Sequence, residues 1–337
     1  MSEELKSLSC VKWYPGNPVL TAADVPYRSD LVFNAGIIPW QDGYAMIFRN
    51  DYGATKEEWE AGKRFDGTNI GLAHSKDGIH WTVEDKPVFD LSGADGGEIG
   101  RAYDPRLTVI DGEVYMCFAV DTRHGLRGAI AKTEDLHHFE ILSMTVPDNR
   151  NIVLFPEKIG GMFVRLERPM PVYSRGRDRF DIWLSESPDM IYWGNAKLVS
   201  GVEDYPYAND KIGPGAPPVK TDRGWLTITH AVDLDRSRGK NGWEDRWQKR
   251  YCAGAMLLDL ADPSKVLGVC REPLLAPETD YEIKEGFRTN AIFATGAVPM
   301  PDGTLRIYYG AADTVVALAE ARIDDLVDVC LAGGPRA

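Results

Sequence analysis

The stretch RAYDPRLTVIDG, residues 101–112, places one acid, Asp104, between two arginines and directly after a tyrosine. The stretch begins a run of strand-forming residues. An aspartate followed by proline is unusual in a strand unless the backbone bends there or the carboxylate has a chemical role. A carboxyl group can donate a proton in general acid catalysis. Asp104 is therefore the first candidate for chemistry in this chain.

Other large polar residues recur at fixed distances from turn glycines. Arg49, Arg168 and His230 come six or seven residues after such a glycine, and Asn34 and Asp104 come eight or nine residues before one. Taken singly, the arginines could form structural ion pairs and the histidine could be a core residue. Their matching positions favour one shared site.

Two more cations, Arg150 in DNRNIVLFP and Lys211 in YANDKIGPG, lie where β-rich runs begin. Alone they would be ordinary solvated side chains. With Arg168 and His230 they form a set of three fixed cations and one titratable ring, which repels itself unless an anion neutralises it. Guanidinium groups bind phosphate oxygens through two hydrogen bonds each. The set therefore predicts a site for a small phosphate-like anion.

Five copies of one three-part segment would position these residues. Each copy has a β-rich run, then a glycine turn with a second run, then a third run that ends near an acid. The turns with their runs occupy residues 41–51, 110–121, 159–169, 222–233 and 301–313, and the acids are Asp77, Asp135, Asp189, Asp262 and Asp325. Three or four short strands repeated five times predict an all-β, five-bladed β-propeller. A two-sheet sandwich would give no reason for the fivefold repeat.

In a propeller the inner strand of each blade lines a central channel, and ligands bind at one mouth of it. The matching polar residues are expected to converge there. The run CVKWYP, which starts at Cys10, is expected to pair with the last blade and close the ring. Residues 1–337 would then form a single propeller domain.

Composition limits the partners. The net charge of −13 disfavours nucleic acid and acidic membrane surfaces. No apolar run approaches the length of a membrane span, and the start MSEELKSLSC does not resemble a signal peptide. The five cysteines lie far apart without a CxxC pair, which predicts reduced thiols in a cytoplasmic protein and no zinc site.

Several blocks occur in a characteristic order, among them LVFNAG…YAMIFRND, YDPRLTVIDGEVY, VLFPEKIGGMFVRLERP and KIGPGAPPVKTDRGWLTITHAVD. In these blocks the chain resembles glycoside hydrolase family 130, the β-mannoside phosphorylases and related hydrolases, which are five-bladed propellers. The resemblance implies inverting phosphorolysis, in which inorganic phosphate attacks a terminal β-mannoside and releases α-mannose 1-phosphate. It is strongest to enzymes acting on β-1,4-mannooligosaccharides or on mannosyl-N-acetylglucosamine.

The resemblance also implies roles for single residues. Asp104 would be the acid, with its proton passing through a mannose hydroxyl. The phosphate ligands would be Arg150, Arg168, Lys211 and His230. The residues around the sugars would be Asn34, Arg49 and Asp313 on the mannose, and Tyr103 on the leaving sugar. Many members carry glutamate where this chain has Tyr103, so the leaving sugar is left open. No metal or cofactor is implied, only phosphate as co-substrate.

The number of carboxylates separates two reaction schemes. An inverting hydrolase needs two, whereas a phosphorylase needs only the acid because phosphate is already an anionic nucleophile. One acid beside a cationic cluster therefore favours a phosphorylase. The alternatives are a β-1,2-mannoside phosphorylase, a β-mannoside hydrolase on the same fold, and a non-catalytic glycan-binding propeller.

Two segments fall outside the repeat. Residues 233–251 contain two tryptophans among many charges, and YSRGRDRF at 173–180 is basic. Each segment is either a solvated loop or a functional one. A functional segment would lie at the sugar-binding mouth, where aromatic rings stack on sugars, or at a contact between subunits. The resemblance implies a homo-oligomer of unspecified size.

Overall fold

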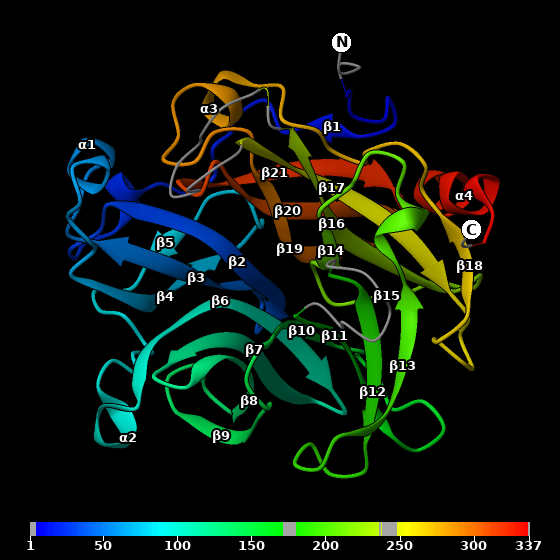
Figure 1. Cartoon of the computed structure of the whole chain (residues 1–337), viewed down its shortest axis with the longest axis horizontal. Coiled ribbons are helices and arrows are strands. Elements are labelled where there is room, and N and C mark those ends of the chain that lie inside the picture. The colour runs from blue at the N-terminus through cyan, green and yellow to red at the C-terminus, as the bar shows by residue number, and fades with distance from the viewer. Residues whose placement is uncertain (1–4, 171–179, 236, 238–247, 336–337) are drawn as a thin grey trace.

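The structure, a computed structural model, describes residues 5–170, 180–235, 237 and 248–335. Five small antiparallel sheets stand around a central axis as the blades of a β-propeller (Figure 1). The predicted all-β, five-bladed architecture is therefore confirmed. The two segments that fall outside the repeat are 173–180 and 233–251. Residues 173–179 of the first, and residues 236 and 238–247 of the second, lie outside the described residues.

Each of the first three blades is a four-stranded meander. Blade one contains β2 (Leu31–Trp40), β3 (Gly43–Tyr52), β4 (Gly67–Ser75) and β5 (Thr82–Val83). Blade two contains β6 (Ile99–Ile110), β7 (Glu113–Thr122), β8 (Gly125–Thr133) and β9 (Phe139–Met144). Blade three contains β10 (Asn149–Leu154), β11 (Phe163–Pro169), β12 (Ile182–Ser187) and β13 (Gly194–Ser200). The first strand of each blade lies nearest the axis (Figure 1).

The last two blades depart slightly from this pattern. Blade four contains β14 (Lys211–Pro214), β15 (Val219–Lys220), β16 (Trp225–Asp235), β17 (Gln248–Leu258) and β18 (Val266–Val269). Blade five contains β19 (Ile292–Pro299), β20 (Thr304–Ala311), β21 (Val315–Arg322) and β1 (Lys12–Trp13). Because β1 pairs antiparallel with β21, the predicted closure of the ring by the first strand is confirmed.

The recurring acids shape the turns after the third strand in the first three blades. Asp77 Oδ1, for example, accepts hydrogen bonds from the backbone N–H groups of Ile79 and His80. Asp135 and Asp189 make the same pair of bonds with the residues two and three positions ahead. These local bonds satisfy backbone donors that no neighbouring strand reaches.

The fifth copy differs, because its third run ends at Arg322 and continues as helix α4 (Ile323–Gly333), with Asp325 in the first turn. Leu326, Val327 and Cys330 form the buried face of this helix, at a spacing that suits a helix and not a strand. The shorter helices are α1 (Lys56–Glu60), α2 (Ala94–Gly97), α3 (Asp280–Ile283) and the 3-10 turns η1 (Ala22–Asp24) and η3 (Val202–Asp204). No helix among the described residues is long and apolar enough to cross a membrane.

Apolar side chains fill the space between neighbouring blades. Ile47 and Leu72 of blade one, for instance, belong to one buried cluster with Met116 and Val120 of blade two. No disulfide joins any of the five cysteines, all of which the structure describes. The packing fixes each blade relative to the next, so the inner strands are held rigidly around the axis.

The inner strands of the first three blades bend at equivalent places. In each, the pairing register shifts at a β-bulge, and the bulged residue has a left-handed backbone: φ is 50° at Asn34, 55° at Asp104 and 57° at Asn151. Asparagine and aspartate tolerate this conformation better than other residues with a side chain. The unusual Asp-Pro pair therefore marks a real bend, and the bend turns the side chain towards the axis.

Candidate functional site

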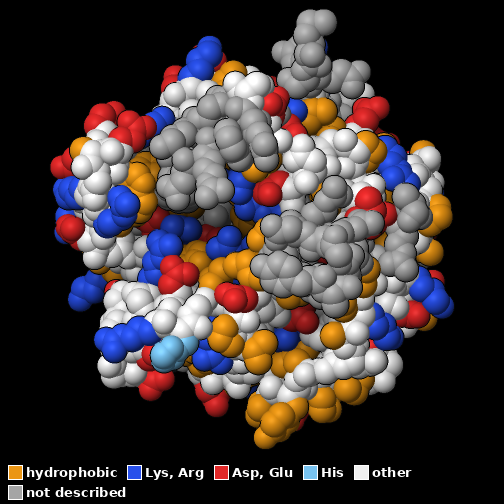
Figure 2. All heavy atoms as spheres, in the orientation of Figure 1, with side chains coloured by type: hydrophobic (Ala, Val, Ile, Leu, Met, Phe, Trp, Pro, Cys, Tyr) orange, Lys and Arg blue, Asp and Glu red, His pale blue; other side chains and the backbone are white. Residues whose placement is uncertain are grey.

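A cavity of about 260 Å³ opens where the inner strands meet, and side chains from all five blades contribute to its wall. Basic side chains gather in this central hollow (Figure 2), although the whole chain has a net charge of −13. Seven of the nine predicted site residues line the cavity: Asn34, Arg49, Tyr103, Asp104, Arg150, Arg168 and Asp313. The repeat-based expectation that these residues converge therefore agrees with the geometry.

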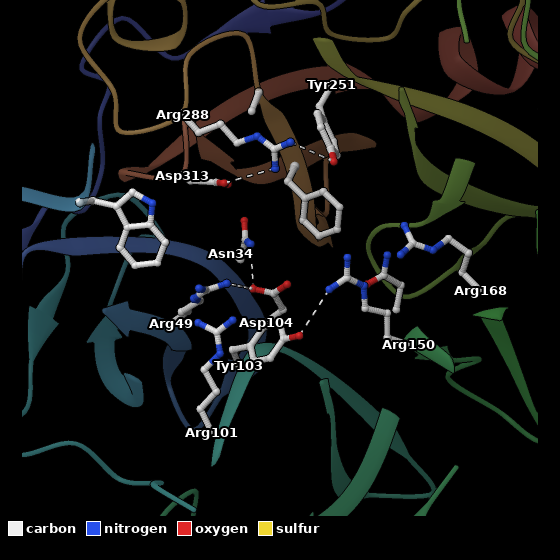
Figure 3. A pocket seen from close by; sticks show the side chains of 14 residues that line it. Asn34, Arg49, Arg101, Tyr103, Asp104, Arg150, Arg168, Tyr251, Arg288 and Asp313 are labelled. Atoms are coloured by element: carbon white, nitrogen blue, oxygen red, sulfur yellow. Dashed lines mark hydrogen bonds and ion pairs between the residues drawn. The ribbon is translucent and has the colours of Figure 1, made fainter. Parts of the chain in front are cut away.

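Asp104 lies near the middle of the cavity wall and is 8% exposed (Figure 3). Its Oδ1 accepts hydrogen bonds from Asn34 Nδ2 at 2.9 Å and from Arg49 Nη1 at 3.2 Å. No described residue donates a hydrogen bond to Oδ2. Burial raises the pKa of Asp104, but Arg49 and Arg106 outweigh it, so the pKa lies below the usual value. The lowered pKa favours the ionised carboxylate at neutral pH.

Arg49 is itself held by a second carboxylate. Its Nε and Nη2 donate to Asp51, with Nη2 2.6 Å from Oδ2, and Thr68 donates to the same carboxylate. Burial opposes the charge of Arg49, but Asp51 and Asp104 raise its pKa well above the usual value. Asn34 and Arg49 thus contact Asp104 directly. The prediction that they also hold mannose hydroxyls stays a prediction.

The clearest electrostatic feature is a pair of facing arginines. Arg150 on β10 and Arg168 on β11 are direct cross-strand partners. No described carboxylate lies within ion-pair distance of either side chain, and the Nε atoms of both are buried without a hydrogen-bond partner. Burial and the charge of Arg150 lower the pKa of Arg168 to about 9. Like charges directly opposite each other destabilise a sheet, so this pair is arranged for an anion.

His230 lies behind Arg168, away from the cavity wall. Arg168 Nη1 donates to His230 Nε2 at 3.2 Å, so we assign the ring proton to Nδ1. Burial and Arg168 lower the pKa of His230 well below its usual value, and the ring is neutral. Gly213 faces His230 across β14 and β16, and a Cβ on it would lie 2.3 Å from His230 Cε1 and 3.0 Å from Arg168 Cδ. A larger residue would displace both side chains.

Lys211 also lies behind the wall, at the start of β14. Its Nζ is 5.7 Å from the centre of the Phe180 ring, over which the Arg168 guanidinium also lies at 4.9 Å. Burial lowers the pKa of Lys211 to about 8. His230 therefore accepts a hydrogen bond from Arg168, and Lys211 shares the Phe180 ring with it. The predicted contact of both residues with phosphate stays a prediction.

Asp313 and Arg288 form the part of the cavity wall that lies away from Arg150 and Arg168 (Figure 3). Arg288 Nη1 is 3.8 Å from Asp313 Oδ2, and Arg288 Nη2 donates to the Tyr251 hydroxyl at 3.3 Å. Burial raises the pKa of Asp313 to about 6, although Arg288 and Arg49 act in the opposite direction. The two carboxylates of the cavity, Asp104 and Asp313, therefore ionise differently.

Sequence reasoning missed several residues that line the cavity. Asn151 carried nearly the same signal as Asn34, because Asn34 lies nine residues before Gly43 and Asn151 lies ten residues before Gly161. Trp59 gave no such signal, because α1 lies in the segment between β3 and β4, outside the repeated turns and runs. Arg101, Tyr251, Arg288, Ala291 and Phe293 also line the cavity. Among the described residues, no group of three or more His, Cys, Asp or Glu is arranged to hold a metal ion.

Comparisons with known proteins agree on one family. Residues 7–332 match the glycoside hydrolase 130 family model, described as beta-1,4-mannooligosaccharide phosphorylase. The beta-1,4-mannooligosaccharide phosphorylase of Ruminococcus albus is 33% identical over 326 residues, covering 94% of this chain and 89% of the relative. The beta-1,2-mannobiose phosphorylase of Listeria innocua is 34% identical over 262 residues, covering 77% and 67%.

A solved structure extends the likeness to the fold. The beta-1,2-mannobiose phosphorylase from Listeria innocua, in complex with beta-1,2-mannobiose, superposes with a TM-score of 0.78 at 26% identity. The match covers 95% of this chain and 99% of that one. The likeness therefore includes all five blades and is not confined to the cavity.

Proposed function

The chain belongs to glycoside hydrolase family 130, the mannoside phosphorylases, and from that premise we propose that it cleaves a terminal β-1,4-linked mannoside with inorganic phosphate. The products are α-mannose 1-phosphate and a shortened mannooligosaccharide or N-acetylglucosamine. The whole ring acts as one catalytic domain, with no metal and with phosphate as the co-substrate.

The observation that carries this proposal is the facing pair Arg150 and Arg168. Arg168 is buried and Arg150 is half-buried, neither has a carboxylate partner among the described residues, and the Nε atom of each is buried without a hydrogen-bond partner. Phosphate satisfies these donors and neutralises the repulsion, whereas the neutral water molecule of a hydrolase could accept a hydrogen bond but would leave the repulsion in place. In Figure 3 the pair lies on the other side of Asp104 from Asp313. Phosphate at the arginine pair and the mannose at Asp313 would therefore occupy different parts of the cavity.

Asp104 protonates the leaving oxygen, by way of a mannose hydroxyl. Oδ1 is fixed by Asn34 and Arg49, which leaves Oδ2 to carry the proton. Arg150 contributes to the lowered pKa of Asp104, so phosphate bound at Arg150 offsets that contribution. The co-substrate thus prepares the acid, and the acid takes up its proton when the site is filled.

The preference for the β-1,4 linkage is supported by the description of the matched family and by the Ruminococcus albus relative, which covers nearly the whole chain. A β-1,2-mannoside is the second candidate. It is favoured by the Listeria innocua enzyme, which has similar identity and whose structure superposes over the full ring.

An assay with defined disaccharides tests the reaction and the linkage together. We expect the protein to form mannose 1-phosphate from β-1,4-mannobiose only when phosphate is present. Mannosyl-N-acetylglucosamine and β-1,2-mannobiose are compared in parallel. Faster phosphorolysis of β-1,2-mannobiose would overturn the linkage. Free mannose released at the same rate without phosphate would overturn phosphorolysis itself.

Phosphate binding is expected to weaken at alkaline pH. Lys211 and Arg168 have pKa values lowered to about 8 and 9, so both are charged at neutral pH and lose their charge as the pH rises through those values. Above each pKa, binding an anion must also take up a proton, so the phosphate KM should rise about tenfold per pH unit for each group. Initial rates at several phosphate concentrations, between about pH 7 and 9.5, measure this change in the phosphate KM. At the upper end of this range phosphate is predominantly dianionic.

The variant Lys211→Met is the control for that profile, because methionine keeps the length of the side chain without its charge. It should remove the lower inflection and leave the upper one. A phosphate KM that stays constant across the range in the unmodified protein would contradict the assigned titrations.

A further inference from the structure

Asp121, near the end of β7, lies next to the site without lining the cavity. Both of its carboxylate oxygens are engaged. Oδ1 accepts a hydrogen bond from the Tyr103 hydroxyl at 2.8 Å, and Oδ2 accepts one from Arg101 Nε at 2.7 Å. Arg101 is also the cross-strand partner of Asp121, so backbone pairing and side chains hold the same arrangement.

The contact with Asp121 determines the direction of the hydrogen bonds around Tyr103. A phenol has one hydrogen, and a carboxylate can only accept, so the hydroxyl hydrogen of Tyr103 points to Asp121. The phenol oxygen is then left as an acceptor, and Arg150 Nη1 donates to it at 3.3 Å. The series Asp121, Tyr103, Arg150 therefore runs from a carboxylate to a cation of the facing pair.

Tyr103 has little freedom to turn. It is 3% exposed, and two guanidinium groups lie near its ring, those of Arg49 at 4.9 Å and Arg101 at 4.7 Å from its centre. Its hydroxyl is the one acceptor that the described residues offer to the Arg150 side chain. The position of that hydroxyl hence determines where the other donors of Arg150 point.

We propose that Asp121 is a positioning residue for phosphate: it fixes the Tyr103 hydroxyl as an acceptor, and this aims Arg150 at the anion. The inference rests on the proposed function, because it takes Arg150 to be a phosphate ligand. It also gives Tyr103 a second task beside the predicted contact with the leaving sugar. Tyr103 directly precedes Asp104, so one short stretch of β6 supports both the acid and the phosphate site.

A simple surface ion pair between Asp121 and Arg101 would not have this effect. The two side chains are 38% and 36% exposed, and exposed pairs contribute little to stability. An effect on phosphate alone therefore distinguishes a positioning role of Asp121 from a structural one. Loss of Asp121 should change the use of phosphate and leave the use of the mannoside almost unchanged.

The test measures the KM for phosphate and for the mannoside separately in Asp121→Ala, in the full-length protein. The phenol hydrogen then lacks its acceptor and the hydroxyl is no longer fixed. We expect the phosphate KM to rise about tenfold, as for the loss of a hydrogen bond to a charged group, and the mannoside KM to change less than about twofold. Asp121→Asn is measured beside it, and phosphate-induced shifts in Tm report binding without turnover.

Glu113→Ala is a matched control. Glu113 lies at the other end of β7 and also accepts hydrogen bonds from a tyrosine, Tyr115 at 2.7 Å, and from a cation, Lys132 at 2.6 Å. It does not line the cavity. The same kind of contact is thus removed from the same strand, and the phosphate KM should not change.

A double-mutant cycle tests whether the two residues act in one series. Tyr103→Phe should raise the phosphate KM as Asp121→Ala does, and the double variant should be no worse than the worse single variant. The inference would be overturned if the effects of the two single variants on the phosphate KM multiplied in the double variant. It would also be overturned if Asp121→Ala left the phosphate KM unchanged, or changed the phosphate KM and the mannoside KM equally.

Arg150→Ala separates this inference from the proposed function. If Arg150→Ala leaves the phosphate KM unchanged, the assignment of the phosphate site fails. If Arg150→Ala raises it while Asp121→Ala does not, only the role of Asp121 fails.

Discussion

The variant Asp104→Asn is expected to lose nearly all phosphorolysis of an unactivated mannoside, with kcat lowered by about 10² to 10⁴. The amide has the shape of the carboxyl group and can still accept hydrogen bonds from Asn34 and Arg49 through Oδ1. Asparagine also tolerates the left-handed backbone at this position, where φ is 55°. What it cannot do is deliver a proton. The fold and phosphate binding should therefore survive while turnover is lost.

The choice of substrate sharpens this test. A nitrophenyl β-mannoside has a leaving group that needs no protonation, so Asp104→Asn should lose much less activity on it than on mannobiose. Asp111→Asn is the matched control, because Asp111 lies in the turn after the same strand, also has a left-handed backbone with φ of 52°, and does not line the cavity. Equal losses on both substrates, or wild-type rates in Asp104→Asn, would show that the acid is a different residue.

The second large effect is expected at the facing pair. Arg168→Ala should raise the phosphate KM by about 10- to 100-fold, since hydrogen bonds to charged groups contribute about 1.5–3 kcal/mol. Removal of one of two facing cations should at the same time leave the free energy of unfolding, measured without phosphate, unchanged or higher. Phosphate should no longer raise its Tm. Initial rates over a range of phosphate concentrations and thermal unfolding with and without phosphate measure both effects.

Arg165→Ala on the same strand should give the opposite result. Arg165 Nη2 is 2.7 Å from Glu167 Oε2, and its Nε donates to Ser185 at 2.9 Å, on a side of the sheet that does not line the cavity. Its loss leaves the buried Glu167 with fewer partners, which lowers Tm, while the phosphate KM stays the same. If Arg168→Ala behaved in the same way, a structural role would explain Arg168 as well.

Much of the fold could be predicted because each blade is encoded by a short segment whose pattern recurs along the sequence. Turn glycines, alternating runs and recurring acids gave five copies of one unit. Each predicted second run contains a strand, and so does each first run except that of the fourth copy, which is divided between β14 and β15. The fifth copy ends in α4 because its last residues have the apolar spacing of a helix. Strand pairing within a blade is local, so the sequence signals were sufficient there.

Less of the site could be predicted, because its residues come from distant parts of the sequence and meet only in the folded ring. The offsets from turn glycines identified Arg49 and Arg168, and an offset close to that of Asn34 would have identified Asn151. Trp59 and Arg288 could not be found in this way, since they lie in segments outside the regular blades. Nor could the sequence separate the residues on the cavity wall from Lys211 and His230, which lie behind it.

The closure of the ring by β1 has a consequence for biosynthesis. β1 leaves the ribosome early, whereas its partner β21 and the wall residues Arg288 and Asp313 are made among the last. Early blades can fold while synthesis continues, but the catalytic chamber has no complete wall until translation has passed the final blade. Nascent chains that lack the fifth blade should therefore be inactive, and turnover should begin only after that blade has been translated and has joined the ring.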